Sequence, residues 1–241
     1  MRLTLRTSIY VRDKLCILYG KIAEDKYPFM AWMGTCGASL VDPHWILTAA
    51  HCTTKFLEKP KPIHFGSNLR GKGWSTKHTA VFKHPKFVHN KIKDRVIHDI
   101  ALIKLENPVP SEIGTPIKLP NNPPVSNYDK FNATMIGWGY NSIPFLAPSD
   151  YLLEAKLVMG GNLPYTFCQI PGKLCSLVST DEGPRMAPGD SGGPLFFEVN
   201  NEFIQIGIIT VLWLHPLKAY INEFTDVAYY SKWVNTIMST H

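Results

Sequence analysis

The distribution of 19 prolines and 17 glycines most constrains the fold of this chain, because they cut its apolar residues into many short runs. Short runs rich in β-branched residues and bounded by turn-forming residues are typical of β-strands. The pattern predicts strands at Trp45–Thr48, Ala101–Leu105, Ala133–Gly137 and Phe203–Val211. Helical periodicity is found near the C-terminus, over about residues 227–240. We therefore expect an all-β barrel or sandwich that ends in one helix.

Composition excludes two classes of protein. Apolar residues make up 45% of the 241 positions and charged residues 18%, which excludes an intrinsically disordered chain. The apolar runs, such as 203–214, are too short to span a membrane. The length fits one large all-β unit or two domains, with a boundary near residues 120–127. Residues 1–11 lack the apolar core of a secretory signal, so either the export signal is absent from this chain or the protein is not exported.

Positive charge is concentrated in one segment. The chain has 25 basic and 19 acidic residues, a formal charge of +6. The segment Lys59–Arg95 holds ten Lys or Arg and four His against one acid, Asp94, so the remaining chain carries about −3. This segment is either a set of solvated loops or a docking surface for an acidic partner or a sulfated polysaccharide. No motif supports a nucleic-acid binder, and we expect no specific nucleic-acid partner.

Three motifs occur in a fixed order and carry the chemistry. They are Leu-Thr-Ala-Ala-His-Cys at 47–52, His-Asp-Ile-Ala-Leu at 98–102 and Pro-Gly-Asp-Ser-Gly-Gly-Pro at 188–194. A serine hydroxyl is a weak nucleophile that needs an adjacent base, and histidine has a suitable pKa. The base needs a carboxylate to fix its tautomer. His51, Asp99 and Ser191 are therefore the candidate catalytic residues, and the N–H groups of Gly189 and Ser191 are the candidate oxyanion hole.

On these motifs the sequence resembles the trypsin/chymotrypsin family of serine endopeptidases. Further matches are Cys36-Gly-Ala-Ser-Leu40, Gly137-Trp-Gly139, Phe224-Thr-Asp-Val227 and Trp233. The resemblance implies two six-stranded antiparallel barrels with the active site between them, and a secreted protease that acts on proteins or peptides through an acyl-enzyme. It implies a first barrel at about 17–120, a second at about 121–226 and a C-terminal helix at about 227–240. Residues 1–16 are then a propeptide-like or aberrant extension.

The family's disulfides and activation site are only partly matched. The resemblance implies the pairs Cys36–Cys52 and Cys168–Cys175 and leaves Cys16 unpaired. It also implies that cleavage before Ile17 frees an α-amino group that pairs with Asp190. Cys16 stands where a tryptic activator needs Lys or Arg, which leaves three readings: an unusual activator, an aberrant N-terminus or a latent protein. We expect a chain that starts at Ile17 to be active and one that starts at Met1 to be inactive.

The residues at the family's primary specificity pocket are unusual. The matching positions carry Arg185, Thr210, Val211, Leu212 and Asn222. Arg185 would repel a basic substrate side chain, so trypsin-like specificity is not expected. Leu212 and Asn222 stand where open pockets have glycine, which narrows or closes the pocket. Two readings remain: a preference for small or acidic side chains, or a blocked pocket with little turnover.

No cofactor or metal is expected. The stretch 66–84, which matches the calcium loop of some relatives, has no carboxylate. His84 and His89 lack the cysteine pair or carboxylate that would complete a zinc site. The leading hypothesis is a secreted serine endopeptidase with restricted specificity, with an activating protease or an inhibitor as further partners. The alternative is a latent or weakly active homologue that binds through the basic segment.

Overall fold

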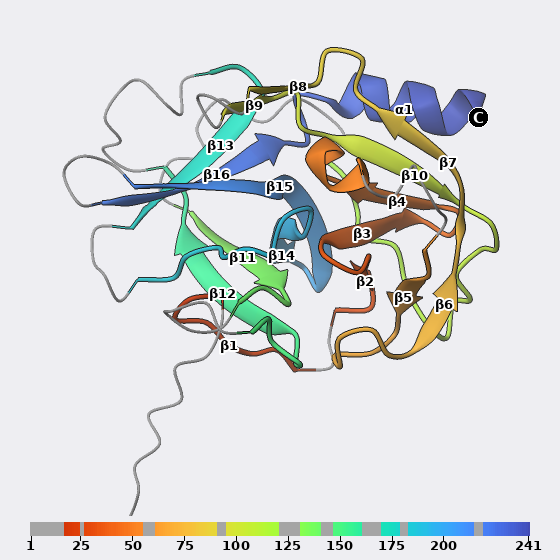
Figure 1. Ribbon diagram of the computed structural model, residues 1–241, viewed down its shortest axis with the longest axis horizontal. Coiled ribbons are helices and arrows are strands. Elements are labelled where there is room, and N and C mark those ends of the chain that lie inside the picture. The colour runs from red at the N-terminus through yellow and green to blue at the C-terminus, as the bar shows by residue number, and fades with distance from the viewer. Residues whose placement is uncertain are drawn as a thin grey trace, which may run out of the picture.

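The computed structural model describes residues 17–24, 27–54, 61–90, 95–120, 131–140, 147–160, 170–178, 183–214 and 219–241. Two curled antiparallel sheets lie side by side, and one helix packs at an end of the molecule (Figure 1). This is the predicted all-β fold with a C-terminal helix. Cys16, Lys59, Asp94, Cys168 and most of the predicted boundary at 120–127 lie outside the described residues.

The first sheet places two predicted catalytic residues at one end. Its strands are β2 (Met30–Trp32), β3 (Gly37–Asp42), β4 (Trp45–Thr48), β5 (Ile63–Phe65), β6 (Trp74–Thr76), β7 (His78–Lys83) and β10 (Ala101–Leu105), in the order β6-β5-β2-β3-β4-β10-β7. β4 and β10 have the predicted bounds and pair antiparallel, with Thr48 opposite Ala101. His51 follows β4 in the short 3-10 helix η1 (Ala50–Thr53), and Asp99 precedes β10. The antiparallel pairing of β4 and β10 therefore brings His51 and Asp99 to the same end of the sheet.

The second sheet carries the serine loop. Its strands are β1 (Lys21–Ile22), β11 (Asn132–Gly137), β12 (Leu153–Val158), β13 (Lys173–Val178), β14 (Pro194–Val199), β15 (Glu202–Leu214) and β16 (Tyr220–Asp226), in the order β1-β12-β11-β14-β15-β16-β13. The two predicted strands of this half lie within β11 and β15. Each of the two sheets has seven strands, whereas the resemblance implied six strands in each barrel. A separate pair, β8 (Val88–Asn90) and β9 (Arg95–Ile97), leads toward Asp99.

One predicted boundary is wrong. The division placed all residues from 17 onward with the first barrel, but β1 pairs with β12 of the second sheet, with Lys21 opposite Glu154. Ile17, four residues before β1, also belongs to this half, since it has no exposed surface and packs among the apolar residues of the second sheet.

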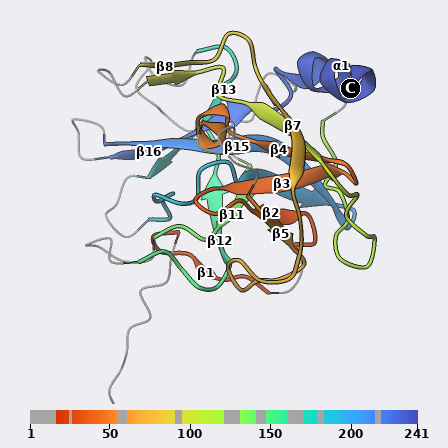
Figure 2. The same ribbon diagram turned by 45° about the vertical axis from the view of Figure 1, so that its right-hand side comes forward.

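The helix α1 (Ser231–Thr240) begins later than the predicted 227. Residues 227–230 form turns, and the side chain of Asp226 accepts a hydrogen bond from the N–H of Ala228 at 3.0 Å. Val234 is fully buried and packs with Trp45 and Leu102 of the first sheet. Figure 2 shows α1 lying near β7, at the edge of that sheet.

Candidate active site

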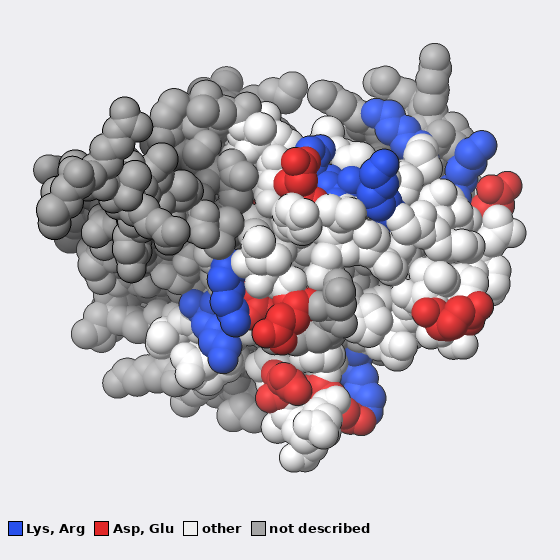
Figure 3. Space-filling model, turned by 90° about the horizontal axis from the view of Figure 1, so that it is seen from below, with Lys and Arg blue, Asp and Glu red and all other residues white. Residues whose placement is uncertain are grey.

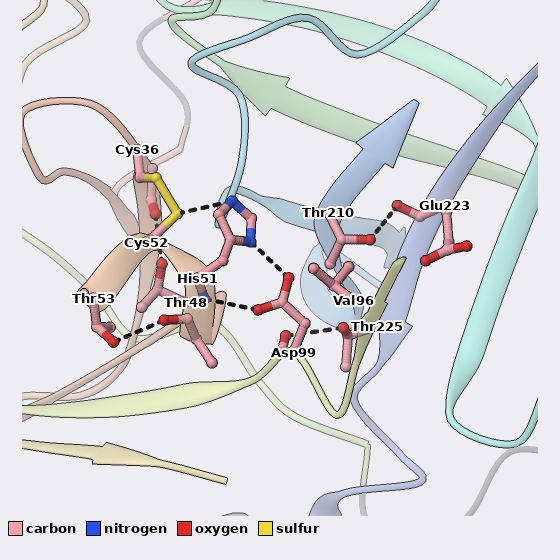
Figure 4. A network of polar contacts seen from close by, with 12 residues as sticks. Cys36, Thr48, His51, Cys52, Thr53, Val96, Asp99, Thr210, Glu223 and Thr225 are labelled. Carbon is pink, nitrogen blue, oxygen red and sulfur yellow. Dashed lines mark hydrogen bonds and ion pairs between the residues drawn. A yellow bond between two sulfur atoms is a disulfide. The ribbon is translucent and has the colours of Figure 1, made fainter. Parts of the chain in front are cut away.

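His51 and Asp99 make two hydrogen bonds with each other. The Nδ1 atom of His51 lies 2.6 Å from Oδ2 of Asp99, and the backbone N–H of His51 donates to Oδ1 at 2.8 Å. Asp99 is 2% exposed, and its own carbonyl accepts a hydrogen bond from the hydroxyl of Thr225 on β16 at 2.9 Å (Figure 4). Residue Asp99 is thus tied through its backbone to β16 of the second sheet, while its carboxylate fixes the orientation of the imidazole ring.

The surroundings of His51 shift its basicity. Burial disfavours the imidazolium, but the hydrogen bond and the charge of Asp99 outweigh burial and raise the pKa of His51 above its ordinary value. The other ring nitrogen, Nε2, lies 3.6 Å from Sγ of Cys52. Cys52 forms the predicted disulfide with Cys36, whose S–S distance is 2.05 Å. The ring therefore lies between the disulfide and the carboxylate (Figure 4).

Ser191 faces the same cavity as His51. Both residues line a cavity of about 440 Å³ between the two sheets. Among the described residues the hydroxyl of Ser191 makes no hydrogen bond, so the contact between Ser191 and the base that an active triad requires is not formed in this structure. Such contacts are often long without substrate.

The loop before Ser191 presents two N–H groups. Gly189 has φ +99°, a conformation that side chains other than glycine rarely adopt. Within the described part of the chain, the N–H groups of Gly189 and Ser191 donate no hydrogen bond, whereas that of Asp190 donates to the carbonyl of Ala187 at 3.0 Å. The N–H groups on either side of Asp190 are therefore unused within the described residues, and an oxyanion hole requires such donors.

Asp190, which lies between Gly189 and Ser191 in this loop, is completely buried. Its carboxylate accepts hydrogen bonds from the N–H groups of Gly139 at 2.7 Å and Ala187 at 2.8 Å. Gly139 must lack a side chain, because a Cβ atom there would lie 2.5 Å from the carboxylate. Burial raises the pKa of Asp190 to about 7, against the lowering effect of the two hydrogen bonds. No ion pair joins Asp190 to any described residue, so it is available to pair with a cationic group.

Comparisons with known proteins identify the family. The family model described as Trypsin matches residues 24–234. The chain belongs to the trypsin family. It is 32% identical to a tryptase of Mus musculus over 237 residues, which cover 88% of this chain and 80% of the relative. It is 30% identical to serine protease SSP1 of Scolopendra subspinipes (86% and 78% covered) and 30% identical to snake venom serine protease BITS01A of Bothrops insularis (89% and 84% covered).

The cavity lining departs from the trypsin-family pocket predicted from the sequence. Thr210, Val211 and Leu212 line the cavity, as expected. The other described lining residues are His51, His89, Val96, Met186, Ala187, Pro188, Ser191 and Ile209. Arg185 and Asn222 are not among them. Asn222 has no exposed surface, accepts a hydrogen bond from the N–H of Met186 at 2.9 Å and donates one to the carbonyl of Pro184 at 3.2 Å.

Arg185 lies away from the cavity. Arg185 is 2% exposed, and its guanidinium carbon lies 3.9 Å from the ring centroid of Tyr220. The sequence interpretation placed Arg185 at the base of a narrowed or closed pocket, but in this structure Arg185 does not line the cavity, whereas its neighbour Met186 does. Met186 takes its place as a lining residue.

Two buried charges near the site escaped the sequence interpretation. Lys173 on β13 pairs with Glu223 on β16, and Lys173 also donates to the carbonyl of Val96 at 2.9 Å. The carbonyl of Glu223 accepts a hydrogen bond from the hydroxyl of Thr210 at 2.8 Å. Since Val96 and Thr210 both line the cavity, the pair connects its two walls. In the sequence, the signal for this pair is limited to the presence of Lys173 in the segment of β13 and Glu223 in the segment of β16.

Other predicted features have partial counterparts. Cys175 is disulfide-bonded, and its predicted partner Cys168 lies outside the described residues. Within the described ranges, one group of ligand atoms lies close enough for a metal ion, formed by Cys36, His51 and Cys52, but its two sulfur atoms are joined to each other. Among the described helices, none is both long and apolar enough to cross a membrane.

On the face of the molecule seen in Figure 3, basic and acidic groups are interspersed. Lys61, Lys72, Lys77 and Lys86 are exposed. Arg70 is instead engaged within the molecule, since it bonds the carboxylate of Asp150 at 2.9 Å and the carbonyl of Ser149 at 2.8 Å.

Proposed function

We propose that this trypsin-family protein is a secreted serine endopeptidase that uses His51, Asp99 and Ser191. The observation that carries the proposal is the pair of hydrogen bonds that fixes the ring of His51 on buried Asp99, at the edge of the cavity that Ser191 lines. A protein that only binds has little use for a buried carboxylate aimed at a histidine. Secretion is supported by the disulfides and by the venom protease among the relatives.

The reaction follows from the positions of these groups. The Nε2 atom of His51 takes the proton of the Ser191 hydroxyl as its oxygen attacks the peptide carbonyl. The N–H groups of Gly189 and Ser191 stabilise the resulting oxyanion; losing one such donor costs about 3 kcal/mol of transition-state stabilisation. His51 then protonates the leaving amine, and water hydrolyses the acyl-enzyme by the reverse sequence. The ring must first exchange its contact with Cys52 Sγ for one with Ser191, a side-chain movement.

The lining of the cavity favours a small uncharged side chain in the substrate. Met186, Val211 and Leu212 offer apolar surface in the cavity that Ser191 lines, and Leu212 occupies space that a glycine would leave open. Acidic side chains gain no ion pair with Arg185, because its guanidinium packs on Tyr220 and it does not line the cavity. Of the two readings left by the sequence, a preference for small side chains is therefore the one that we adopt.

Covalent labelling tests the proposal. A fluorophosphonate probe reacts with an activated serine, so the form that starts at Ile17 is expected to be labelled at Ser191 and the S191A variant to remain unlabelled. The form that starts at Met1 is expected to react far more slowly, because Asp190 has no α-amino group to pair with. Absence of labelling, together with retained binding to an acidic polymer such as heparin that depends on Lys72 and Lys77, would support the latent homologue instead.

A further inference from the structure

We propose that Arg185 is a positioning residue that clamps the segment Ile17–Gly20 to the second sheet and does not contact the substrate. The proposal rests on the proposed peptidase function, since it concerns how the same active site is organised. Arg185, which matches the family's specificity position in the sequence, would thus hold the segment Ile17–Gly20.

Two aromatic rings hold the guanidinium. Its central carbon lies 3.9 Å from the ring centroid of Tyr220 on β16 and 5.4 Å from that of Tyr19 in the N-terminal segment. Cations over aromatic faces within about 6 Å are attracted to the ring, more strongly when water is excluded. Arg185 is 2% exposed, so its contact with Tyr220 is shielded from water, and the same guanidinium also contacts the ring of Tyr19, which is 43% exposed.

Backbone pairing reinforces the clamp. Leu18 and Arg185 form an antiparallel bridge, in which the N–H of Arg185 donates to the carbonyl of Leu18 at 3.0 Å. On the other side Asn222 holds the residues before and after Arg185, through the carbonyl of Pro184 and the N–H of Met186. Tyr220 and Asn222 are two apart on β16 and therefore project from the same face of the strand.

The segment needs such a clamp because its backbone is strained. Ile17 has φ +41° and Tyr19 has φ +68°, conformations that side-chain-bearing residues rarely adopt, least of all a β-branched one. Ile17 is nevertheless fully buried. Strain of this kind persists only where surrounding contacts determine the conformation. Cleavage before Ile17 removes the constraint on its φ, while the clamp continues to hold Leu18 and Tyr19.

The clamp predicts a specific pH effect. A free α-amino group has a pKa of about 7.7–8.0, and docking beside the carboxylate of Asp190 raises it. The activity of the form that starts at Ile17 is therefore lost as pH rises through this raised value. A tenfold weaker docking lowers that alkaline limit by about one pH unit, as long as the docked form still predominates at pH 7.

The experiment compares kcat/KM from pH 6 to 11 for the wild type, R185L and Y220L, all starting at Ile17, with a peptide panel varied at the primary position. We expect R185L and Y220L to lower the alkaline limit by about one unit while the order of preferred side chains stays the same. Y220F, which keeps the ring, is expected to retain the wild-type limit. A changed side-chain preference with an unmoved limit would show that Arg185 contacts substrate, and unchanged behaviour in both respects would also overturn the clamp.

A measurement without turnover separates this proposal from the proposed function. If the wild type neither labels nor hydrolyses peptides, the peptidase function fails, but the clamp can still be tested by hydrogen exchange of the amide at position 185. We expect its protection to be lost about one pH unit lower in R185L and Y220L than in the wild type. Equal protection in all forms would refute the clamp.

Discussion

At the scale of single residues, Asp99 sets the properties of His51. The base must be neutral to accept a proton, and Asp99 raises its pKa against the effect of burial, so the acid limb of kcat/KM is expected above pH 6.5. D99N removes both the charge and the tautomer control. We expect kcat to fall on the order of 10⁴-fold, and the acid limb of the residual activity to move to lower pH.

Rates measured from pH 4 to 9 for the wild type and D99N check this prediction. D150N, at an exposed carboxylate that bonds Arg70, is the matched control and is expected to keep the wild-type profile. An acid limb that stays in place in D99N would mean that another group controls the base.

At the scale of elements, the disulfide Cys36–Cys52 fixes the short helix η1 against the start of β3. It closes a loop with a sequence separation of 16, for which chain entropy alone predicts about 3 kcal/mol of stability. In a chain of this length, such a loss lowers the melting temperature by about 6–12 °C. Since His51 lies on η1, we expect the C36A/C52A variant to lose activity at temperatures where it is still folded. Calorimetry and peptide hydrolysis on the same samples test this, and an unchanged melting temperature would contradict it.

At the scale of the whole molecule, Lys173 and Glu223 connect the two walls of the cavity through Val96 and Thr210. Both side chains are almost completely buried, so removing one partner leaves an uncompensated charge. We expect K173M and E223L each to cost about 3–5 kcal/mol of unfolding free energy, and the double variant to cost much less than their sum. Urea unfolding of the four proteins gives the coupling. Additive losses would show that the pair does not act as a unit.

Much of this architecture could be predicted because it depends on local patterns. β4 and β10 appear in the sequence as short apolar runs, and the residues that follow and precede them gave His51 and Asp99. Position 185 could not be predicted in the same way. The stacking of Arg185 between Tyr19 and Tyr220 depends on segments far apart in the chain. Likewise, the pairing of β1 with β12 joins segments far apart in the chain, and no local pattern reveals it.

Peptide turnover decides directly whether Ser191 hydrolyses peptide bonds. The form that starts at Ile17 and its S191A variant are incubated with a peptide mixture that varies at the primary position, and the products are identified by mass spectrometry. We expect cleavage after small uncharged side chains by the wild type and no cleavage by S191A. Products that are equally abundant with both proteins, or wild-type cleavage mainly after Lys and Arg, would contradict it.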